Sequence, residues 1–281
     1  MTIEFPHDGA ARAFEFSTAE FDALSRVLHD WAGIRLPRSK QGGVYARVKP
    51  RLAALGLGTF AEYCALVASG AGQAERSALM GVLGLRDTGF FRHPQQFEHL
   101  RRCLAPLADR ARRGGRVRLW SAGCATGEEA YSLGLALLSL GADLPERDVR
   151  ILATDIDPVI LCHAEAGIYD GDAALAVPEA LRPLNTGPDG ALHMPEELRR
   201  IIAFRALDLR DGWPFRGGFD IIFCRGVICH FDLATREEVL ERLALRLVPD
   251  GVLYLGPGAR LSGAASRLLQ PSGAAAFVRR G

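Results

Sequence analysis

The feature that most constrains the fold is a change of pattern near Arg116. Before this point apolar residues recur only at helical spacing, and after it short apolar runs alternate with helical segments. Strands are expected at 117–120, 149–154, 219–223, 251–256 and 276–279, and helices at 128–140, at 158–166 and from Thr235. Strands that alternate with helices predict an α/β fold with a doubly wound, largely parallel sheet.

The first 85 residues predict a small all-helical domain. Capping-box patterns open helices at Ser17 and Thr59, and further helices are expected at 43–55 and 74–83. We therefore expect a helical domain at 1–85, a connecting segment at 86–115 and an α/β domain at 116–281. The segment 183–202 breaks the strand–helix rhythm and is expected to form a small inserted subdomain.

Composition excludes several classes of protein. The 281 residues carry a net charge of +1, which argues against a nucleic-acid-binding protein. The six cysteines form no C-x-x-C pair, so a structural zinc site or other metal site is not expected. The longest apolar stretch, 130–142, is too short to span a bilayer, and the first residues show no secretory signal. A cytoplasmic protein without membrane insertion is expected.

The turn after the first strand, WSAGCATGEE at 120–129, is the first candidate site, because ligands bind at the carboxyl ends of strands in such sheets. Gly123 would let a ligand approach the backbone, and Thr126 with Glu129 forms a capping-box pattern. The glycine spacing is not that of a dinucleotide site, and no lysine follows as in a P-loop. The two glutamates suit a ligand with an ammonium or sulfonium group. A tight turn with ordinary capping acids is the alternative.

Asp155 ends the second strand in ATDID at 153–157. A carboxylate there can accept hydrogen bonds from both hydroxyls of a ribose. Alternatively it caps the next helix, a role for which Asp157 is better placed. The turn and Asp155 together favour a nucleoside ligand without phosphates, and S-adenosylmethionine is the candidate.

Five motifs occur in an order typical of one family: RDTGFFR (86–92), WSAGCATGEE, ATDID, FDIIFCRGVICHFD (219–232) and PDGVLYLG (249–256). In them the chain resembles the chemotaxis receptor methyltransferases, the CheR family, over nearly its whole length. The resemblance implies a Rossmann-like methyltransferase sheet and a monomer that uses S-adenosylmethionine, releases S-adenosylhomocysteine and methylates glutamates on the cytoplasmic helical region of chemoreceptors. It implies cofactor contacts at Thr88, Arg92, Glu129, Asp155, Asp208, Leu209, Gly226 and Val227.

This chemistry requires few catalytic groups. A substrate glutamate, with an ordinary pKa near 4.3, is already ionised at neutral pH, so no strong general base is expected. Arg92 is the candidate for orienting the incoming carboxylate or the carboxylate of the cofactor, and a surface arginine at a helix start is the alternative. His230 stands where the family has an active-site tyrosine.

Several positions depart from the family pattern. Arg86, Asp208 and Gly226 each stand where the family has asparagine, and the segment 256–259 replaces Gly-His-Ser-Glu with Gly-Pro-Gly-Ala. These changes keep a second interpretation open, a divergent, weak or inactive relative that binds the cofactor as a sensor or scaffold. A nicotinamide oxidoreductase comes third, because the dinucleotide glycine pattern is missing.

A basic run without any acid indicates the macromolecular partner: Arg35, Arg38, Lys40, Arg47, Lys49 and Arg51 lie within 17 residues. Arg47 and Arg51 are four residues apart and would share one helix face. Such a face suits docking onto an acidic receptor helix, as the family uses it. Solvated surface charge is the alternative.

Overall fold

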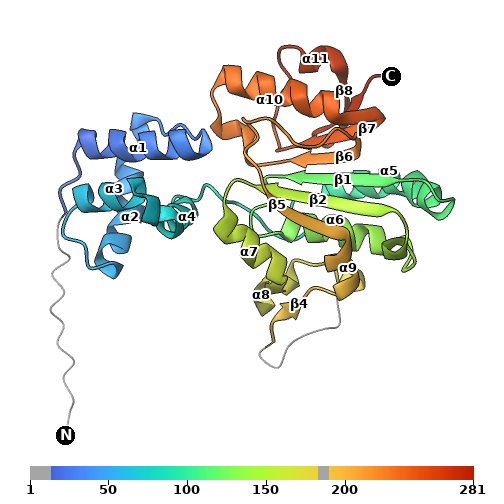
Figure 1. The fold of residues 1–281 in the computed structure, drawn as a ribbon, viewed down its shortest axis with the longest axis horizontal. Helices are drawn as coiled ribbons and strands as arrows, with labels where there is room; N and C mark the ends of the chain where they lie inside the picture. The colour runs from blue at the N-terminus through green and yellow to red at the C-terminus, as the bar shows by residue number, and fades with distance from the viewer. Residues whose placement is uncertain (1–13, 183–189) are drawn as a thin grey trace, which may run out of the picture. The chain divides into compact units, whose positions relative to one another are not determined.

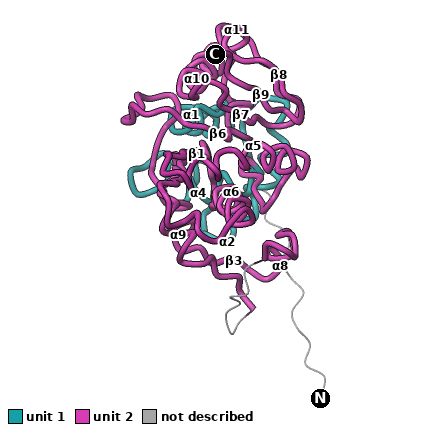
Figure 2. Tube along the Cα trace, turned by 90° about the vertical axis from the view of Figure 1, so that its right-hand side faces the viewer, with its two compact units in different colours: residues 1–84 teal, residues 85–281 magenta. Residues whose placement is uncertain are grey.

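The structure is a computed structural model that describes residues 14–182 and 190–281, so most of the first half of the expected insertion lies outside the described residues. The chain divides into two compact units, Met1–Gly84 and Leu85–Gly281 (Figure 2).

The described part of the first unit is helical, as expected. It contains α1 (Thr18–Ala32), α2 (Gln41–Ala54), α3 (Phe60–Ala68) and α4 (Gln73–Val82). Both predicted capping boxes form: the Ser17 and Thr59 hydroxyls each accept a hydrogen bond from the backbone N–H three residues on, at 3.2 Å. The amphipathic faces bury a common apolar core.

The second unit is built on one sheet with the strand order β5-β2-β1-β6-β7-β9-β8. Its strands are β1 (Val117–Ala122), β2 (Val149–Asp155), β5 (Ile202–Ala206), β6 (Phe219–Cys224), β7 (Leu247–Leu255), β8 (Leu269–Gly273) and β9 (Ala276–Arg279). The first five in this order are parallel, and β9 is antiparallel to β7 and β8. The doubly wound prediction is confirmed. The strand order reverses between β1 and β6, and doubly wound sheets bind their ligands at the carboxyl ends of the strands at such a point.

Helices cover both faces of the sheet (Figure 1). Successive strand residues point to opposite faces. Leu119 and Ile221 belong to a core that includes residues of α5 (Pro94–Arg112) and α6 (Glu128–Leu138), whereas Trp120 and Ile222 belong to a second core with α10 (Leu233–Arg246). Burial on both faces explains why the central strands are almost entirely apolar.

The structure also contains elements that the sequence pattern does not predict. Most of the expected connecting segment forms α5, which starts with Pro94 in its first turn. Strands β5 and β8 are additional, and β3 (Ile168–Tyr169) pairs with β4 (Leu192–His193) in a separate small sheet. The short helices α8 (Gly171–Leu175), α9 (Glu196–Ile201) and α11 (Ala265–Leu268) complete this unit with α7 (Pro158–Ala166), which has its expected bounds.

The predicted start of α10 is wrong by two residues. The helix begins at Leu233, because the Asp232 carboxylate accepts a hydrogen bond from the backbone N–H of Thr235 at 2.9 Å and is the N-cap. Aspartate is among the best N-cap residues.

Candidate active site

Two glycines shape the turn between β1 and α6. Gly123 has φ +86°, and a Cβ there would overlap the Val227 side chain from the turn after β6. Gly127 has φ +98°, and a Cβ there would lie 2.8 Å from the Tyr169 hydroxyl. Only glycine meets both the backbone angle and the close approach at these points. The turn therefore brings the candidate residues Gly123 and Val227 into contact.

The expected capping box at the start of α6 does not form. Gly127 is the N-cap, and the Thr126 hydroxyl donates to the Glu128 carboxylate at 2.7 Å. The Thr88 hydroxyl donates to the same carboxylate at 3.2 Å. Glu129 therefore does not cap α6, and its carboxylate is hydrogen-bonded to residues outside the helix.

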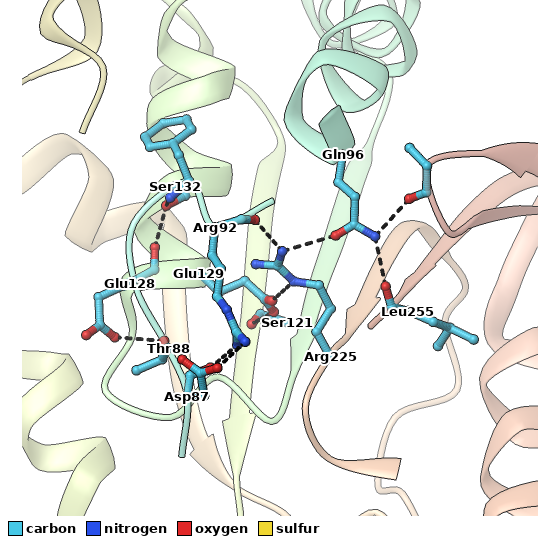
Figure 3. A network of polar contacts seen from close by, with 12 residues as sticks. Asp87, Thr88, Arg92, Gln96, Ser121, Glu128, Glu129, Ser132, Arg225 and Leu255 are labelled. Atoms are coloured by element: carbon cyan, nitrogen blue, oxygen red, sulfur yellow. Dashed lines mark hydrogen bonds and ion pairs between the residues drawn. The ribbon is translucent and has the colours of Figure 1, made fainter. Parts of the chain in front are cut away.

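Glu129, on α6, is held by one residue of β1 and by one that directly follows β6 (Figure 3). Its Oε1 accepts a hydrogen bond from the Ser121 hydroxyl on β1 at 2.6 Å, and its Oε2 accepts one from Nε of Arg225, just after β6, also at 2.6 Å. The side chains of Arg225 and Glu129 are 6% and 8% exposed, so this is a buried ion pair. Each carboxylate oxygen has a second lone pair, which leaves Glu129 able to accept from a ligand.

Asp155 lies at the end of β2, beside the turn. Its Oδ2 accepts from the backbone N–H of Ala125 at 3.0 Å, and its Oδ1 from that of Asp157 at 3.1 Å. Desolvation raises the pKa of Asp155, although these two N–H groups oppose the shift. Asp155 thus tethers the β1–α6 turn and keeps one lone pair on each oxygen.

Asp157 is the N-cap of α7, so the alternative interpretation of Asp155 as the helix cap is wrong. Its Oδ1 accepts from the backbone N–H of Val159 at 2.9 Å. Its other oxygen pairs with the Arg86 guanidinium, and the Asp157 side chain is only 1% exposed. Arg86, one of the departures from the family pattern, therefore ties the 86–92 motif to the end of β2.

The rest of the 86–92 motif follows the same edge of the sheet. The Arg92 guanidinium pairs with the Asp87 carboxylate and donates to the Asp87 carbonyl. The backbone N–H of Phe91 donates to the Ser132 hydroxyl on α6 at 2.9 Å. Phe91 and His93 have positive φ values of 48° and 62°, which non-glycine residues adopt at an energetic cost. Several contacts thus fix the backbone around Arg92.

Asp208 and Leu209 follow β5, the strand next to β2. The backbone N–H of Leu207 donates to the Asp155 carbonyl at 2.9 Å, which joins this loop to the Asp155 region. The Asp208 carboxylate is paired with the Arg210 guanidinium at 2.7 Å, and Leu209 is buried. The two residues therefore lie just beyond the carboxyl end of β5, a strand that the sequence pattern did not predict.

Gly226, Val227 and His230 form the turn after β6. Gly226 is exposed, has φ +73°, and has no atom within 4 Å of where a Cβ would stand. His230 ends a single 3₁₀ turn, Ile228–His230, and burial lowers the pKa of its imidazole. No hydrogen bond in the described ranges joins the His230 side chain to another candidate side chain.

The predicted docking arginines both have partners within the first unit. The Arg51 guanidinium makes a bidentate ion pair with the buried Glu75 carboxylate at 2.7 Å, and the Tyr63 hydroxyl donates to that carboxylate at 2.8 Å. Arg47 is exposed and donates to the Leu83 carbonyl. These contacts stabilise the helical unit, whatever further role the side chains have.

The site lies at the carboxyl edge of the sheet and has four carboxylates from three segments: Glu128 and Glu129 at the start of α6, Asp155 at the end of β2, and Asp208 after β5. Such an edge suits a ligand with a positive charge and hydroxyl groups, and it disfavours phosphates. The sequence patterns do not reveal Ser121, which lies within the 120–129 motif 8 residues before its partner Glu129, or Arg225, which lies 96 residues from that partner. The only sequence signal for Arg225 is its place directly after an apolar strand. Among residues 14–182 and 190–281, His, Cys, Asp and Glu side chains form no group of three or more that would hold a metal ion, and no helix is long and apolar enough to cross a membrane.

Two family models match the chain. One, described as the SAM-binding domain of CheR methyltransferase, matches residues 86–276, and the other, the all-alpha domain of CheR methyltransferase, matches residues 19–83. The boundary between them coincides with that between the two compact units.

Named relatives resemble the chain over most of their length. A probable chemotaxis protein methyltransferase of Rhizobium etli is 41% identical over 88% of this chain and 94% of its own. Chemotaxis protein methyltransferase 2 of Pseudomonas aeruginosa is 36% identical over 86% and 87%, and the chemotaxis protein methyltransferase of Escherichia coli is 36% identical over 85% and 84%.

Proposed function

Because the chain belongs to the CheR methyltransferase family, we propose that it is an S-adenosylmethionine-dependent protein-glutamate O-methyltransferase that acts on the cytoplasmic helical region of chemoreceptors. One observation carries this proposal: the Glu129 carboxylate is held by Ser121 near the end of β1, Asp155 ends the adjacent parallel strand β2, and each carboxylate has lone pairs left for a ligand.

The residues of this edge fit the cofactor. Asp155 would accept hydrogen bonds from the ribose hydroxyls, and Glu129 would accept from the ammonium group. Gly123 lets the ligand approach the backbone. Cofactor contacts are also proposed at Thr88, Arg92, Asp208, Leu209, Gly226 and Val227. S-adenosylmethionine, when bound, supplies a methyl group on a positively charged sulfur, and no metal is needed for the transfer.

The residues of the site would then act mainly by aligning the substrate carboxylate with the methyl group of the cofactor. With the cofactor held at Glu129 and Asp155, the site would place an ionised substrate glutamate in line with the methyl group, so that the methyl could pass to a carboxylate oxygen as its bond to sulfur breaks. Arg92 would orient the substrate carboxylate, for which it must exchange its exposed pairing with Asp87 for the incoming carboxylate. His230, neutral near pH 7 because burial lowers its pKa, would line the same opening.

Receptor docking is proposed for helix α2. Its Arg47 is exposed, and Arg51 is one-third exposed despite its pair with Glu75. We further propose that the protein acts as a monomer in the cytoplasm, where the receptor helices lie.

Transfer of labelled methyl from S-adenosylmethionine to receptor-containing membranes tests the function. Labelled ester should form and be released by mild base, and Asp155→Ala should abolish labelling by removing cofactor affinity. Asp172→Ala, which removes an exposed carboxylate on α8, is the matched control and should label normally. Cofactor binding by the wild-type chain without any labelled receptor would refute the proposal.

A further inference from the structure

Gln96, at the start of α5, uses every polar atom of its buried side chain. Its Nε2 donates to the carbonyl oxygens of Leu255, at the end of β7, and Ala274, in the turn before β9, at 2.8 and 2.9 Å. Its Oε1 accepts from Nη1 of Arg225 at 3.1 Å. The two carbonyls require the amide nitrogen and the guanidinium requires the amide oxygen, so this network fixes the orientation of the amide.

Arg225 connects Gln96 to the residues of the candidate site (Figure 3). Its Nη1 also donates to the Arg92 carbonyl at 2.5 Å, and its Nε donates to Glu129. The guanidinium carbon lies 5.2 Å from the ring centre of Phe223 and 5.7 Å from that of Phe97. Arg225 is therefore held from the side opposite Glu129 by Gln96 and cannot change its position without breaking the amide contact.

We propose that Gln96 is a positioning residue for the cofactor: through Arg225 it fixes the Glu129 carboxylate and the Arg92 backbone in their ligand-binding positions. This inference rests on the proposed methyltransferase function. The network crosses the sheet edge from Ser121 on β1 to Leu255 on β7, so it ties the ligand-facing carboxylate to a part of the sheet that makes none of the proposed cofactor contacts.

The test compares Gln96→Met with Asp220→Asn. Methionine keeps the length of the side chain but removes all three hydrogen bonds. Asp220 is buried at the opposite, amino end of β6, where it pairs with Arg110, so its variant perturbs the same sheet away from the site. We expect Gln96→Met to raise the KM for S-adenosylmethionine and the Kd for S-adenosylhomocysteine about tenfold, the effect of one misplaced charged hydrogen bond. Asp220→Asn should lower the unfolding temperature and leave both constants unchanged. Gln95→Ala, an exposed neighbour, should change nothing.

A double-mutant cycle shows whether Gln96 acts through Glu129. In a Glu129→Gln background, where the ion pair is absent and only the contact with the Arg92 carbonyl remains, Gln96→Met should weaken cofactor binding less than it does in the wild-type background. If Gln96→Met proves too unstable to assay, Arg225→Lys serves instead: it keeps a cation near Glu129 but lacks the fork that reaches Gln96 and Arg92, and should raise the same KM. Unchanged cofactor constants in Gln96→Met, or the same loss in both backgrounds, would overturn the inference. Wild-type protein that binds no cofactor would instead refute the proposed function.

Discussion

Arg86 is the departure from the family pattern with the clearest structural consequence. Where the family has a small amide, this chain has a guanidinium that neutralises the buried Asp157 carboxylate and lowers the pKa of Asp155 by its charge, against the larger effect of desolvation. Asp157 also caps α7. One substitution thus links the 86–92 motif, the helix start and the proposed ribose site.

Arg86→Ala should destabilise the second unit by about 2–4 kcal/mol, because it leaves a buried carboxylate without its partner. Urea unfolding measures this. Adding Asp157→Asn removes the unpaired charge and keeps an N-cap acceptor, so the double variant should regain at least half of the loss. A double variant no more stable than Arg86→Ala would show that the ion pair is not the cause.

Gly226 is a departure that can be reversed. The position has φ +73° and open space around it, and asparagine tolerates that backbone conformation better than other residues with a Cβ. Gly226→Asn should therefore fold normally and, by restoring one hydrogen bond worth about 1 kcal/mol, tighten S-adenosylhomocysteine binding about fivefold. Gly226→Ala is the control, since it adds the Cβ without the amide. Titration calorimetry in which both variants bind equally would contradict this expectation.

At the scale of elements, α2 and α4 are joined by a buried charge. Glu75 is 7% exposed and is satisfied by Arg51 and Tyr63, and burial together with that carboxylate raises the pKa of Tyr63. The basic face proposed for docking is therefore also part of what holds the helical unit together.

Arg51→Ala should lower the free energy of unfolding of the helical unit by about 2 kcal/mol. Arg47→Ala removes only one hydrogen bond, to the partly buried Leu83 carbonyl, and should cost about 1 kcal/mol or less. Chemical denaturation followed by circular dichroism measures both. If the two variants lose receptor methylation equally while only Arg51→Ala loses stability, docking and folding are separate roles. Equal stability of both variants would contradict the structural role of Arg51.

Helix α5 carries His99 against β7 and β8. Its imidazole contacts the Tyr254 hydroxyl at 2.8 Å and the Ser272 hydroxyl at 3.1 Å, and burial lowers its pKa. The folded chain therefore binds a proton at His99 less readily than the unfolded chain. This contribution to stability is complete above the unfolded pKa of about 6.5 and declines as the pH falls toward the lower folded value.

We expect the unfolding temperature to fall between about pH 7.5 and pH 5.5, and to fall less in His99→Gln, whose amide can still accept from Tyr254. His93 and His230, whose pKa values are also lowered by burial, remain in both proteins. The difference between the two curves of unfolding temperature against pH therefore reports the contribution of His99. Parallel pH curves for the two proteins would count against this assignment.

The elements that the sequence predicts well are those with a strong local signal. Buried strands β1, β2 and β6 appear as apolar runs, and α1 and α3 carry complete capping boxes. Strand β8 has no such signal, because it is an exposed edge strand with Pro271 and Gly273. Helix α5 has buried residues at helical spacing, but Pro106 interrupts the pattern.

The site was predictable only in part, for the same physical reason. Gly123 and Asp155 follow strands directly, so local position indicates their place. Arg225, one of the two partners of Glu129, is 96 residues away, and hydrogen bonds between distant segments leave no periodicity in the sequence. The Thr126–Glu129 capping pattern was misleading because a stronger, buried partner competes for that carboxylate.

At the scale of the whole molecule, the net charge is close to zero, but the charged residues are unevenly distributed along the chain. The chain has 34 basic and 33 acidic residues, yet Arg35 to Arg51 contains six cations and no acid. Arg38 is paired with Asp22, and Arg51 with Glu75, while Arg35 and Lys40 are exposed. Attraction of this run to an acidic helix would act over about 10 Å at 0.1 M salt and shorten as salt is added.

Raising the salt concentration from about 50 to 500 mM should therefore increase the KM for receptor several-fold and leave the cofactor KM unchanged, since Glu129, the proposed partner of the cofactor's ammonium group, is buried and is screened less. Arg35→Ala/Lys40→Ala should reduce this salt dependence. Arg260→Ala/Arg280→Ala removes the same charge from exposed positions of the second unit and should leave it intact. Because the two double variants have equal net charge, any difference between them comes from where the charge lies. Equal salt dependence in both would place receptor docking outside the basic run.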